Sequence, residues 1–232
     1  MSDRAEQLRS NLDDVRRRIA DATRAAGRTD EVGLVVVTKF FPVSDVRLLA
    51  ELGVTDVGEN RHQEAEAKAA ECADLGLRWH FVGGLQSNKA AAVASYADVV
   101  ESVDRTKLVG ALSRGAHQRS HEVDVLLQVS LDPPGSDHRS GADPADLPEL
   151  AAHVADAGML RLRGLMAVAP LGADPSEAFA RLAAVHRDLL VDHPEATVLS
   201  AGMSADLEAA VAHGATHVRV GSAVLGPRPA VQ

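Results

Sequence analysis

Apolar residues recur at intervals of three and four positions at the start of the chain, between residues 4 and 26. Charged residues occupy the positions between them, and this arrangement is typical of an amphipathic helix. The face that we expect to be buried is formed by Leu8, Leu12, Val15 and Ile19. Gly27 follows, and glycine is the residue that most often ends a helix. The pattern therefore predicts one long helix within residues 1–27.

Beyond this helix, short apolar runs alternate with amphipathic segments. The apolar runs predict strands at 33–39, 56–60, 79–83, 99–104, 123–130, 160–168, 197–201 and 217–221. The amphipathic segments predict helices at 44–52, 61–73, 87–96, 106–117, 145–157, 176–191 and 204–213. Strands that alternate with helices form parallel sheets, and eight such units close a TIM barrel.

The predicted fold class is therefore α/β. We expect a single (β/α)8 TIM barrel over residues 33–228 with an extra N-terminal helix, all within one domain of residues 1–232. A chain of 232 residues suits one such domain. The alternative is an open, doubly wound sheet, but no G-x-G-x-x-G sequence follows the first strand.

Composition limits the classes of function. The formal net charge is −9, which does not suit the basic surface of a nucleic-acid-binding protein. Cys72 is the only cysteine, so no internal disulfide can form. The polar N-terminus does not resemble a signal peptide, and no apolar run is long enough to span a membrane. We expect a cytoplasmic, monomeric protein that binds neither nucleic acid nor membranes.

Lys39 ends the first predicted strand, Gly33-Leu-Val-Val-Val-Thr-Lys39, where an ammonium group is unusual. One explanation is that its charge simply reaches solvent at the end of the strand. The other is that desolvation lowers the pKa of a lysine and provides an amine that forms a Schiff base. Side chains alternate along a strand, so Lys39 and Val37 would both point into the barrel, at the mouth where active sites of this fold lie.

Two turns at the ends of strands seven and eight are rich in hydrogen-bond donors. The first, Leu199-Ser-Ala-Gly-Met-Ser-Ala-Asp-Leu207, contains Gly202 and an expected helix N-cap at Ser204. The second, Val218-Arg-Val-Gly-Ser-Ala223, offers the N–H groups of Gly221 and Ser222, with Arg219 on the same strand face as Gly221. The loops after strands seven and eight form the usual phosphate site of a TIM barrel. A phosphate site is therefore favoured over two plain capped turns.

Polar turns also follow strands two and three. Asn60 either hydrogen-bonds a ligand at the barrel mouth or caps the next helix. Arg61 and Lys89 are possible anion contacts, but we expect them in solvated surface positions. His117 and His121 have the spacing of a helical metal pair, but no third ligand accompanies them, so no metal site is predicted.

Together these segments make the chain resemble the pyridoxal 5′-phosphate homeostasis protein family (YggS/PROSC-like), which is related to the N-terminal domain of alanine racemase. The resemblance rests on Val-Val-Thr-Lys39-Phe-Phe-Pro42, Gly58-Glu-Asn-Arg-His-Gln-Glu64, Trp79-His-Phe-Val-Gly-Gly-Leu-Gln-Ser-Asn-Lys89, Glu101-Ser-Val-Asp104, Arg163-Gly-Leu-Met166, Leu199-Ser-Ala-Gly-Met-Ser204 and Val218-Arg-Val-Gly221. Each motif alone is weak, but the ordered set is specific and covers nearly the whole chain.

The resemblance implies that the cofactor is pyridoxal 5′-phosphate (PLP) and that Lys39 holds it as a Schiff base. It assigns five residues to the phosphate cradle: Ser200, Met203, Ser204, Gly221 and Ser222. It also places Asn60 close to the ring. Arg219 would lie near the pyridine nitrogen, where a permanent cation disfavours protonation.

The function that the resemblance implies is intracellular PLP homeostasis without catalysis, with PLP-dependent apo-enzymes as recipients. One alternative is a PLP-dependent amino-acid racemase or lyase, and another is a Schiff-base aldolase acting on a sugar phosphate. Racemases of similar fold use a tyrosine base from a second domain. The only tyrosine of this chain is Tyr96, on a predicted helix, which favours the carrier.

Four positions differ from the usual family pattern. Gly84 stands where a histidine is common, Ser130 replaces an asparagine, Ala201 replaces a methionine, and Arg139 lies near a common lysine. We expect none of them to touch Lys39 or the phosphate turns. Arg139 belongs to a Pro/Gly-rich loop at 132–141, and long loops at this end of a barrel are often functional.

Overall fold

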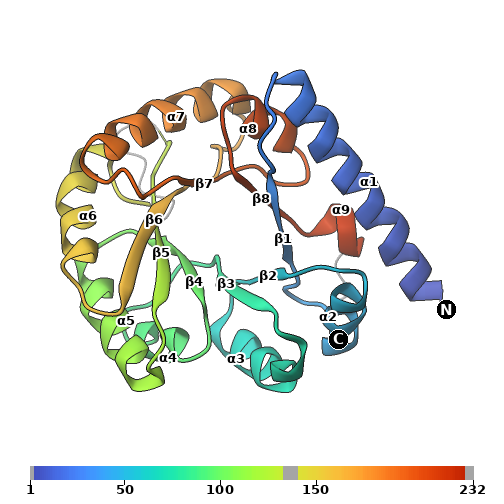
Figure 1. Ribbon diagram of the computed structural model, residues 1–232, viewed down its shortest axis with the longest axis horizontal. Coiled ribbons are helices and arrows are strands. Elements are labelled where there is room, and N and C mark those ends of the chain that lie inside the picture. Colours follow the sequence, from blue (N-terminus) through green and yellow to red (C-terminus); the bar gives the residue numbers. More distant parts are fainter. Residues whose placement is uncertain (1–2, 133–140, 228–232) are drawn as a thin grey trace.

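Eight parallel strands close into a barrel with the helices around its outside (Figure 1). The computed structural model describes residues 3–132 and 141–227. Each strand pairs with the next, and β8 returns to pair with β1. The strands are β1 Gly33–Val37, β2 Asp56–Glu59, β3 Arg78–Phe81, β4 Val99–Val103, β5 Val123–Gln128, β6 Leu160–Met166, β7 Val198–Ser200 and β8 His217–Val220. The predicted TIM barrel is confirmed for the described residues.

The helices follow the strands in the predicted alternation. They are α1 Asp3–Ala25, α2 Val43–Glu51, α3 His62–Glu71, α4 Ala90–Ala94, α5 Thr106–Arg119, α6 Leu147–Ala155, α7 Pro175–Asp192, α8 Leu207–Ala212 and α9 Ser222–Leu225, with short 3-10 helices η1 Ala73–Leu75 and η2 Pro144–Asp146. The last helix and the two 3-10 turns were not predicted, because elements this short show no periodicity. Over the described ranges, the chain has no helix with the length and apolar character needed to cross a membrane.

Several elements are shorter than predicted. β1 ends at Val37, so Lys39 lies in the turn that follows the strand. α4 keeps five residues of the predicted 87–96, and α8 begins at Leu207, three residues after Ser204. Main-chain hydrogen bonds decide where an element ends, whereas the side-chain pattern continues past that point. Residue 228, the predicted end of the barrel, lies outside the described residues.

α1 runs along the outside of the barrel next to α8 and α9 (Figure 1). Its predicted apolar face is buried, and Leu8 and Leu12 are at most 1% exposed. They share one apolar core with Leu207 and Val211 of α8 and Val224 of α9. Full burial of one such side chain contributes about 1.5–3 kcal/mol. The extra N-terminal helix is therefore an integral part of the core.

The side chains at the end of β1 alternate as predicted. Val36 packs in the outer core against the helices, whereas Val37 lines a cavity at the mouth of the barrel. Thr38 is buried, and its hydroxyl donates to Glu59 Oε1 at 2.7 Å. Lys39 lines the same cavity as Val37. The strand therefore directs Lys39 into the barrel mouth.

Candidate functional site

A cavity of about 430 Å³ lies at the C-terminal ends of the strands. Seven of the eight predicted site residues line it: Lys39, Asn60, Met203, Ser204, Arg219, Gly221 and Ser222. They lie on β8 and in the turns that follow β1, β2, β7 and β8, and they meet because the barrel closes. The eighth residue, Ser200, is completely buried and is not part of the cavity lining.

The turn that carries Lys39 is held on both sides. The N–H of Thr38 donates to Gly58 O at 2.9 Å, and the N–H of Phe40 donates to Glu64 Oε1 at 2.7 Å. Phe40 has a φ of 70°, in the left-handed region that residues other than glycine rarely adopt. Such a conformation persists only where its surroundings fix it. The neighbours of Lys39 therefore set the direction of its side chain.

A buried lysine on α3, Lys68, completes these contacts. Its ammonium group donates to Thr38 O at 2.9 Å and to Oε1 of both Glu59 and Glu64 at 2.7 Å. Lys68 is 5% exposed and Glu59 is 1% exposed. Burial raises the pKa of Glu59, and the nearby Lys68 and Thr38 offset only part of this effect. We call Lys68, Glu59 and Glu64 the anchor cluster, because they fix the turn that carries Lys39.

The anchor cluster was not predicted from the sequence. Its one visible signal is the spacing of Glu64 and Lys68, which is that of a helical ion pair. Most such pairs are solvated and contribute little, so the spacing does not distinguish this pair from others. The third member, Glu59, comes from β2, and only the folded chain brings it to Lys68.

Asn60 faces the cavity and does not cap α3. The N-cap of α3 is Arg61, and no side-chain cap bond is made, so the capping alternative is wrong. The Oδ1 atom of Asn60 is buried and has no hydrogen-bond partner in residues 3–132 and 141–227. An unpaired buried acceptor is unfavourable, and a donor on a ligand would satisfy it. Gly83 packs against the Asn60 main chain, since an added Cβ would lie 2.2 Å from Asn60 O.

The turns after β7 and β8 meet at another part of the cavity wall. Gly202 has a φ of 91°, and an added Cβ would lie 2.6 Å from a side chain of α8, so only glycine fits there. The prediction that Ser204 caps α8 is wrong, because the N-cap position is Asp206. Ser204 Oγ instead accepts hydrogen bonds from Ser222 Oγ at 3.2 Å and from the N–H of Ala223 at 3.3 Å. Two hydroxyl groups therefore meet where a phosphate was predicted.

Met203 and Gly221 complete this part of the wall. The N–H of Met203 donates to Asp206 Oδ1 at 2.6 Å, so it is not available to a phosphate. Gly221 lies against the end of β1, where an added Cβ would be 3.1 Å from Val37 O. Glycine at this position lets the β8 turn approach the strand that leads to Lys39.

Arg219 lines the cavity and is tied to a row of buried polar groups inside the barrel. Its Nη1 donates to Ser200 Oγ at 2.7 Å, and Ser200 Oγ donates to Glu101 Oε2 at 2.6 Å. Glu101 Oε1 pairs with His80 Nδ1 at 2.7 Å, and His80 Nε2 lies 2.9 Å from Asp56 Oδ1. We call these five residues the charge chain. The hydroxyl of Ser200 therefore positions Arg219, and it does not reach the phosphate cradle as predicted.

The charge chain keeps its groups ionised in spite of burial. Burial alone would raise the pKa of Glu101, but the hydrogen bond and charge of His80, together with Arg219 and Ser200, lower that pKa to about 2. Burial alone would lower the pKa of His80, but hydrogen bonds to Asp56 and Glu101 raise it. Burial lowers the pKa of Arg219, and the charge of Glu101 offsets part of this. Arg219 is thus a fixed cation that Glu101 balances from behind.

The positions that depart from the family pattern have different surroundings. Gly84 lines the same cavity as Lys39, and the expectation that it does not touch Lys39 stays a prediction. Ala201 is 1% exposed, and Ser130 pairs through its main chain with Ala142. Neither belongs to the cavity lining. Arg139 and residues 133–140 of the predicted loop lie outside the described residues.

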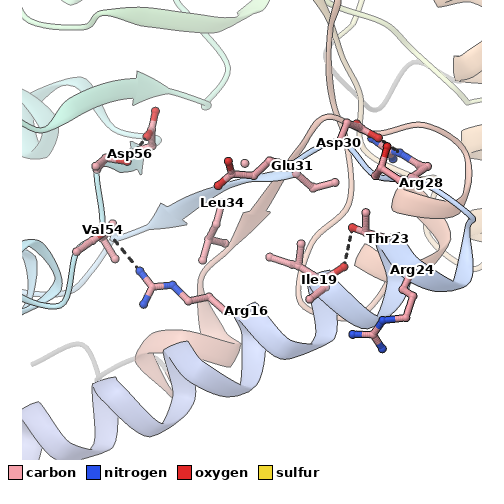
Figure 2. A pocket seen from close by; sticks show the side chains of 16 residues that line it. Arg16, Ile19, Thr23, Arg24, Arg28, Asp30, Glu31, Leu34, Val54 and Asp56 are labelled. Carbon is pink, nitrogen blue, oxygen red and sulfur yellow. Dashed lines mark hydrogen bonds and ion pairs between the residues drawn. The ribbon is translucent and has the colours of Figure 1, made fainter.

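A larger cavity, of about 710 Å³, lies beneath α1 at the opposite ends of β1 and β2 (Figure 2). Its arginines are already engaged. Arg16 donates to the carbonyl groups of Leu52 and Gly53, and Arg28 pairs with Asp30. No lysine lines this cavity, and it lies away from the strand ends where barrel sites form. The Lys39 cavity is therefore the better candidate for the functional site.

The chain is similar to proteins of known sequence and structure. Residues 5–229 match the family described as "Alanine racemase, N-terminal domain". A relative from Mycobacterium bovis, named pyridoxal phosphate homeostasis protein, is 46% identical, and the match covers 97% of this chain and 95% of the relative. The PLP-bound structure of PipY from Synechococcus elongatus has a TM-score of 0.82 and 36% identity, covering 94% of this chain and 100% of PipY. Alanine racemase from Corynebacterium glutamicum, at 17% identity, shares the fold with a TM-score of 0.67, over 98% of this chain and 63% of that enzyme.

Proposed function

The chain belongs to the alanine racemase N-terminal domain family and, within it, to the pyridoxal phosphate homeostasis proteins, and from this we propose that it is a carrier of PLP. It holds PLP as a Schiff base on Lys39 and takes part in intracellular PLP homeostasis, without catalysis of its own. One observation carries the proposal: a single cavity is lined by Lys39, Arg219, Ser204 and Ser222.

The residues of this cavity fit PLP in chemistry and in space. The unpaired Oδ1 atom of Asn60 requires a hydrogen-bond donor, which a ligand can provide. The paired hydroxyls of Ser204 and Ser222 suit the phosphate oxygens. Arg219 is a cation suited to the pyridine nitrogen. A volume of about 430 Å³ is also adequate for a ligand of this size.

The protein contributes position and charge. When bound, PLP supplies an aldehyde that condenses reversibly with a primary amine. The anchor cluster fixes the turn so that Lys39 presents its amine to the cavity. The charge chain holds Arg219 in place as a cation, which disfavours a proton on the pyridine nitrogen. An unprotonated ring is a weaker electron sink than a protonated one, although racemases of similar fold use the same arrangement.

A PLP-dependent racemase or lyase is the second candidate, because the fold is shared with alanine racemase. Tyr96, the only tyrosine of the chain, lies with its Oη 3.5 Å from His62 Nδ1 and does not line the cavity. It is therefore not placed to act as a base opposite Lys39, which supports the carrier. Exchange of amino-acid α-protons in deuterated water separates the two functions. A carrier gives no exchange above the rate of free PLP, whereas exchange that depends on Lys39 would show an enzyme.

Transfer to other proteins belongs to the same proposal. PLP-dependent apo-enzymes are the recipients that homeostasis requires, since they are the proteins that use this cofactor. A monomeric state and a cytoplasmic location remain predictions from the sequence.

Lys39 can be tested directly, because the chain contains only four lysines: Lys39, Lys68, Lys89 and Lys107. We expect the purified protein to show a visible absorption band. Borohydride reduction followed by peptide mass mapping should place the label on Lys39, and Lys39→Ala should lose the band. Lys107→Ala, which removes an exposed lysine on α5, is the control and should keep the band. A label found mainly on another lysine of the wild-type protein would refute the assignment.

A further inference from the structure

A second chamber opens beside the Lys39 cavity. Its volume is about 440 Å³, and its polar lining is Asn60, Arg61, His62, Gln63, Gln86 and Lys89. Asn60 and Gly84 line both spaces, so the two are contiguous at the barrel mouth. We call this space the basic chamber.

The basic chamber has an unusual charge for this protein. Among the residues that the structure describes, no carboxylate lines it, although the formal net charge of the chain is −9. Within residues 3–132 and 141–227, neither Arg61 nor Lys89 has a hydrogen-bonded or ion-paired carboxylate. Elsewhere, comparable arginines are paired, such as Arg47 with Asp74 at 2.9 Å and Arg119 with Asp98 at 2.9 Å. In the described part of the chain, Arg61 and Lys89 therefore face the chamber without the counter-charges that Arg47 and Arg119 have.

The walls of the chamber are held by other contacts. The guanidinium of Arg61 lies 5.0 Å from the ring centroid of Phe40, which is the residue after Lys39. The N–H of Lys89 donates to Gln86 O at 2.9 Å, and Arg105 Nη2 donates to Leu85 O at 2.7 Å. These bonds fix the loop after β3, so the ammonium of Lys89 is attached to a rigid wall.

His62 also lines the chamber. Its ring stacks on Tyr96 at a centroid distance of 5.9 Å, and Glu66 Oε2 lies 3.8 Å from His62 Nε2. Glu66 is not part of the chamber lining. Arg61 and Lys89, which are charged at neutral pH, therefore suffice to make the chamber attractive to an anion.

We propose that the basic chamber binds the carboxylate or phosphate group of a second small molecule while PLP occupies the neighbouring cavity. This inference rests on the proposed function, because the Lys39 cavity must be filled by PLP for the chamber to act as a separate site. Arg61 and Lys89 bind the oxyanion, and the amides of Gln63 and Gln86 hydrogen-bond to the rest of the ligand. Since Asn60 borders both spaces, the second ligand would lie directly beside the bound cofactor.

Isothermal titration calorimetry of the PLP-loaded, full-length protein tests the proposal, with malonate and inorganic phosphate as separate probes. We expect at least one probe to bind, and Lys89→Gln to weaken its binding about tenfold, as loss of one charge-assisted contact would. Arg61→Gln should act in the same direction. Tighter binding of malonate than of phosphate identifies a carboxylate ligand, and the reverse order identifies a phosphate ligand.

Lys107→Gln is the matched control, because Lys107 is an exposed lysine outside the chamber that has no carboxylate partner in the described residues. This variant should bind the probe as the wild-type protein does. Equal binding by wild type and Lys89→Gln, or equal weakening by Lys89→Gln and Lys107→Gln, would overturn the proposal. Failure of the proposed function is distinguishable, since the wild-type protein would then show no visible PLP band before any anion is added.

Discussion

The two ends of the barrel differ in how completely their polar groups are paired. At the N-terminal end, Asp124 pairs with both Arg78 and Arg161, and Asp56 pairs with His80. At the C-terminal mouth, and within the residues that the structure describes, Asn60 Oδ1 is buried without a partner, and Arg61 and Lys89 face a chamber that no carboxylate lines. Pairing at one end stabilises the fold, whereas the unpaired groups at the other end are available to ligands.

The charge chain connects these two ends through the barrel interior. It begins at Asp56, at the start of β2, and reaches the mouth at Arg219. TIM-barrel interiors are usually filled by layers of branched apolar side chains. Here a small apolar cluster of Val99, Leu126 and Met166 shares that space with the charge chain. The charge of Arg219 at the C-terminal mouth is thus balanced through a chain of groups that begins at the N-terminal end of the barrel.

The largest effect is expected from Glu101→Ala. Glu101 is buried between His80 and Arg219, so its removal takes one of two carboxylates from His80 and the paired carboxylate from Arg219. Loss of one partner from a buried ion pair typically lowers the free energy of unfolding by about 3–5 kcal/mol. Urea unfolding measures this change. Glu122→Ala is the control, because Glu122 is 52% exposed and surface changes usually stay within about 0.5 kcal/mol. Equal losses in the two variants would contradict the role given to the charge chain.

Two similar carboxylates, one at each end of the barrel, test whether only the C-terminal mouth affects ligand binding. Glu64 accepts the N–H of Phe40 at 2.7 Å and pairs with Lys68. Asp98, directly before β4, accepts the N–H of Trp79 at 2.9 Å and pairs with Arg119. Their side chains are 25% and 18% exposed, so the two carboxylates have similar surroundings at opposite ends of the barrel.

Glu64→Gln and Asp98→Asn should each lower the free energy of unfolding, by about 1–2 kcal/mol, because each weakens charge-assisted hydrogen bonds. Only Glu64→Gln should also weaken PLP binding, about tenfold, because it loosens the turn that carries Lys39. Titration of PLP by visible absorbance measures the second effect, and Glu64→Asp should restore part of it. If both variants bind PLP as the wild type does, the anchor cluster is structural only.

The sequence is sufficient to predict the barrel and most of the residues that line its mouth. Strand and helix periodicities predict eight units, and closure then brings Lys39, Ser204 and Arg219 together. The end of β1 could not be predicted, because the apolar run continues to Thr38 while the pairing ends at Val37. The ends of elements depend on hydrogen bonds to neighbouring strands, and a single-chain pattern does not record these bonds.

The charge chain and the anchor cluster were beyond prediction for a different reason. Glu101 and Ser200 are 99 residues apart, and neither shows by spacing that it will face the other. The family resemblance places Ser200 in the phosphate cradle together with Ser204. In the structure, its hydroxyl is occupied between Glu101 and Arg219. Long-range pairs of this kind depend on the exact register of the barrel.

The smallest expected effect is a change in the free energy of unfolding with pH, and it is caused by His80. Its pKa is raised above the ordinary value of 6.5, because hydrogen bonds to Asp56 and Glu101 outweigh burial. A raised pKa stabilises the folded protein below pH 6.5, and this contribution is lost as the pH rises through the folded-state pKa. The free energy of unfolding should therefore fall between pH 6.5 and pH 8.5, by at most about 1.4 kcal/mol per pH unit.

Other groups that titrate near this range do not mask the effect. Burial lowers the pKa of both His186 and His217, so their contributions change only below pH 6.5. The pKa of Cys72 is raised from 9.0 by burial, so its contribution changes at higher pH. Urea unfolding of wild type and His80→Gln at pH 6.5, 7.5 and 8.5 measures the slope. The variant should have a flat profile. If the free energy of unfolding fell equally in both proteins, another group would cause the pH dependence. The state of Arg219 would then not depend on the protonation of His80.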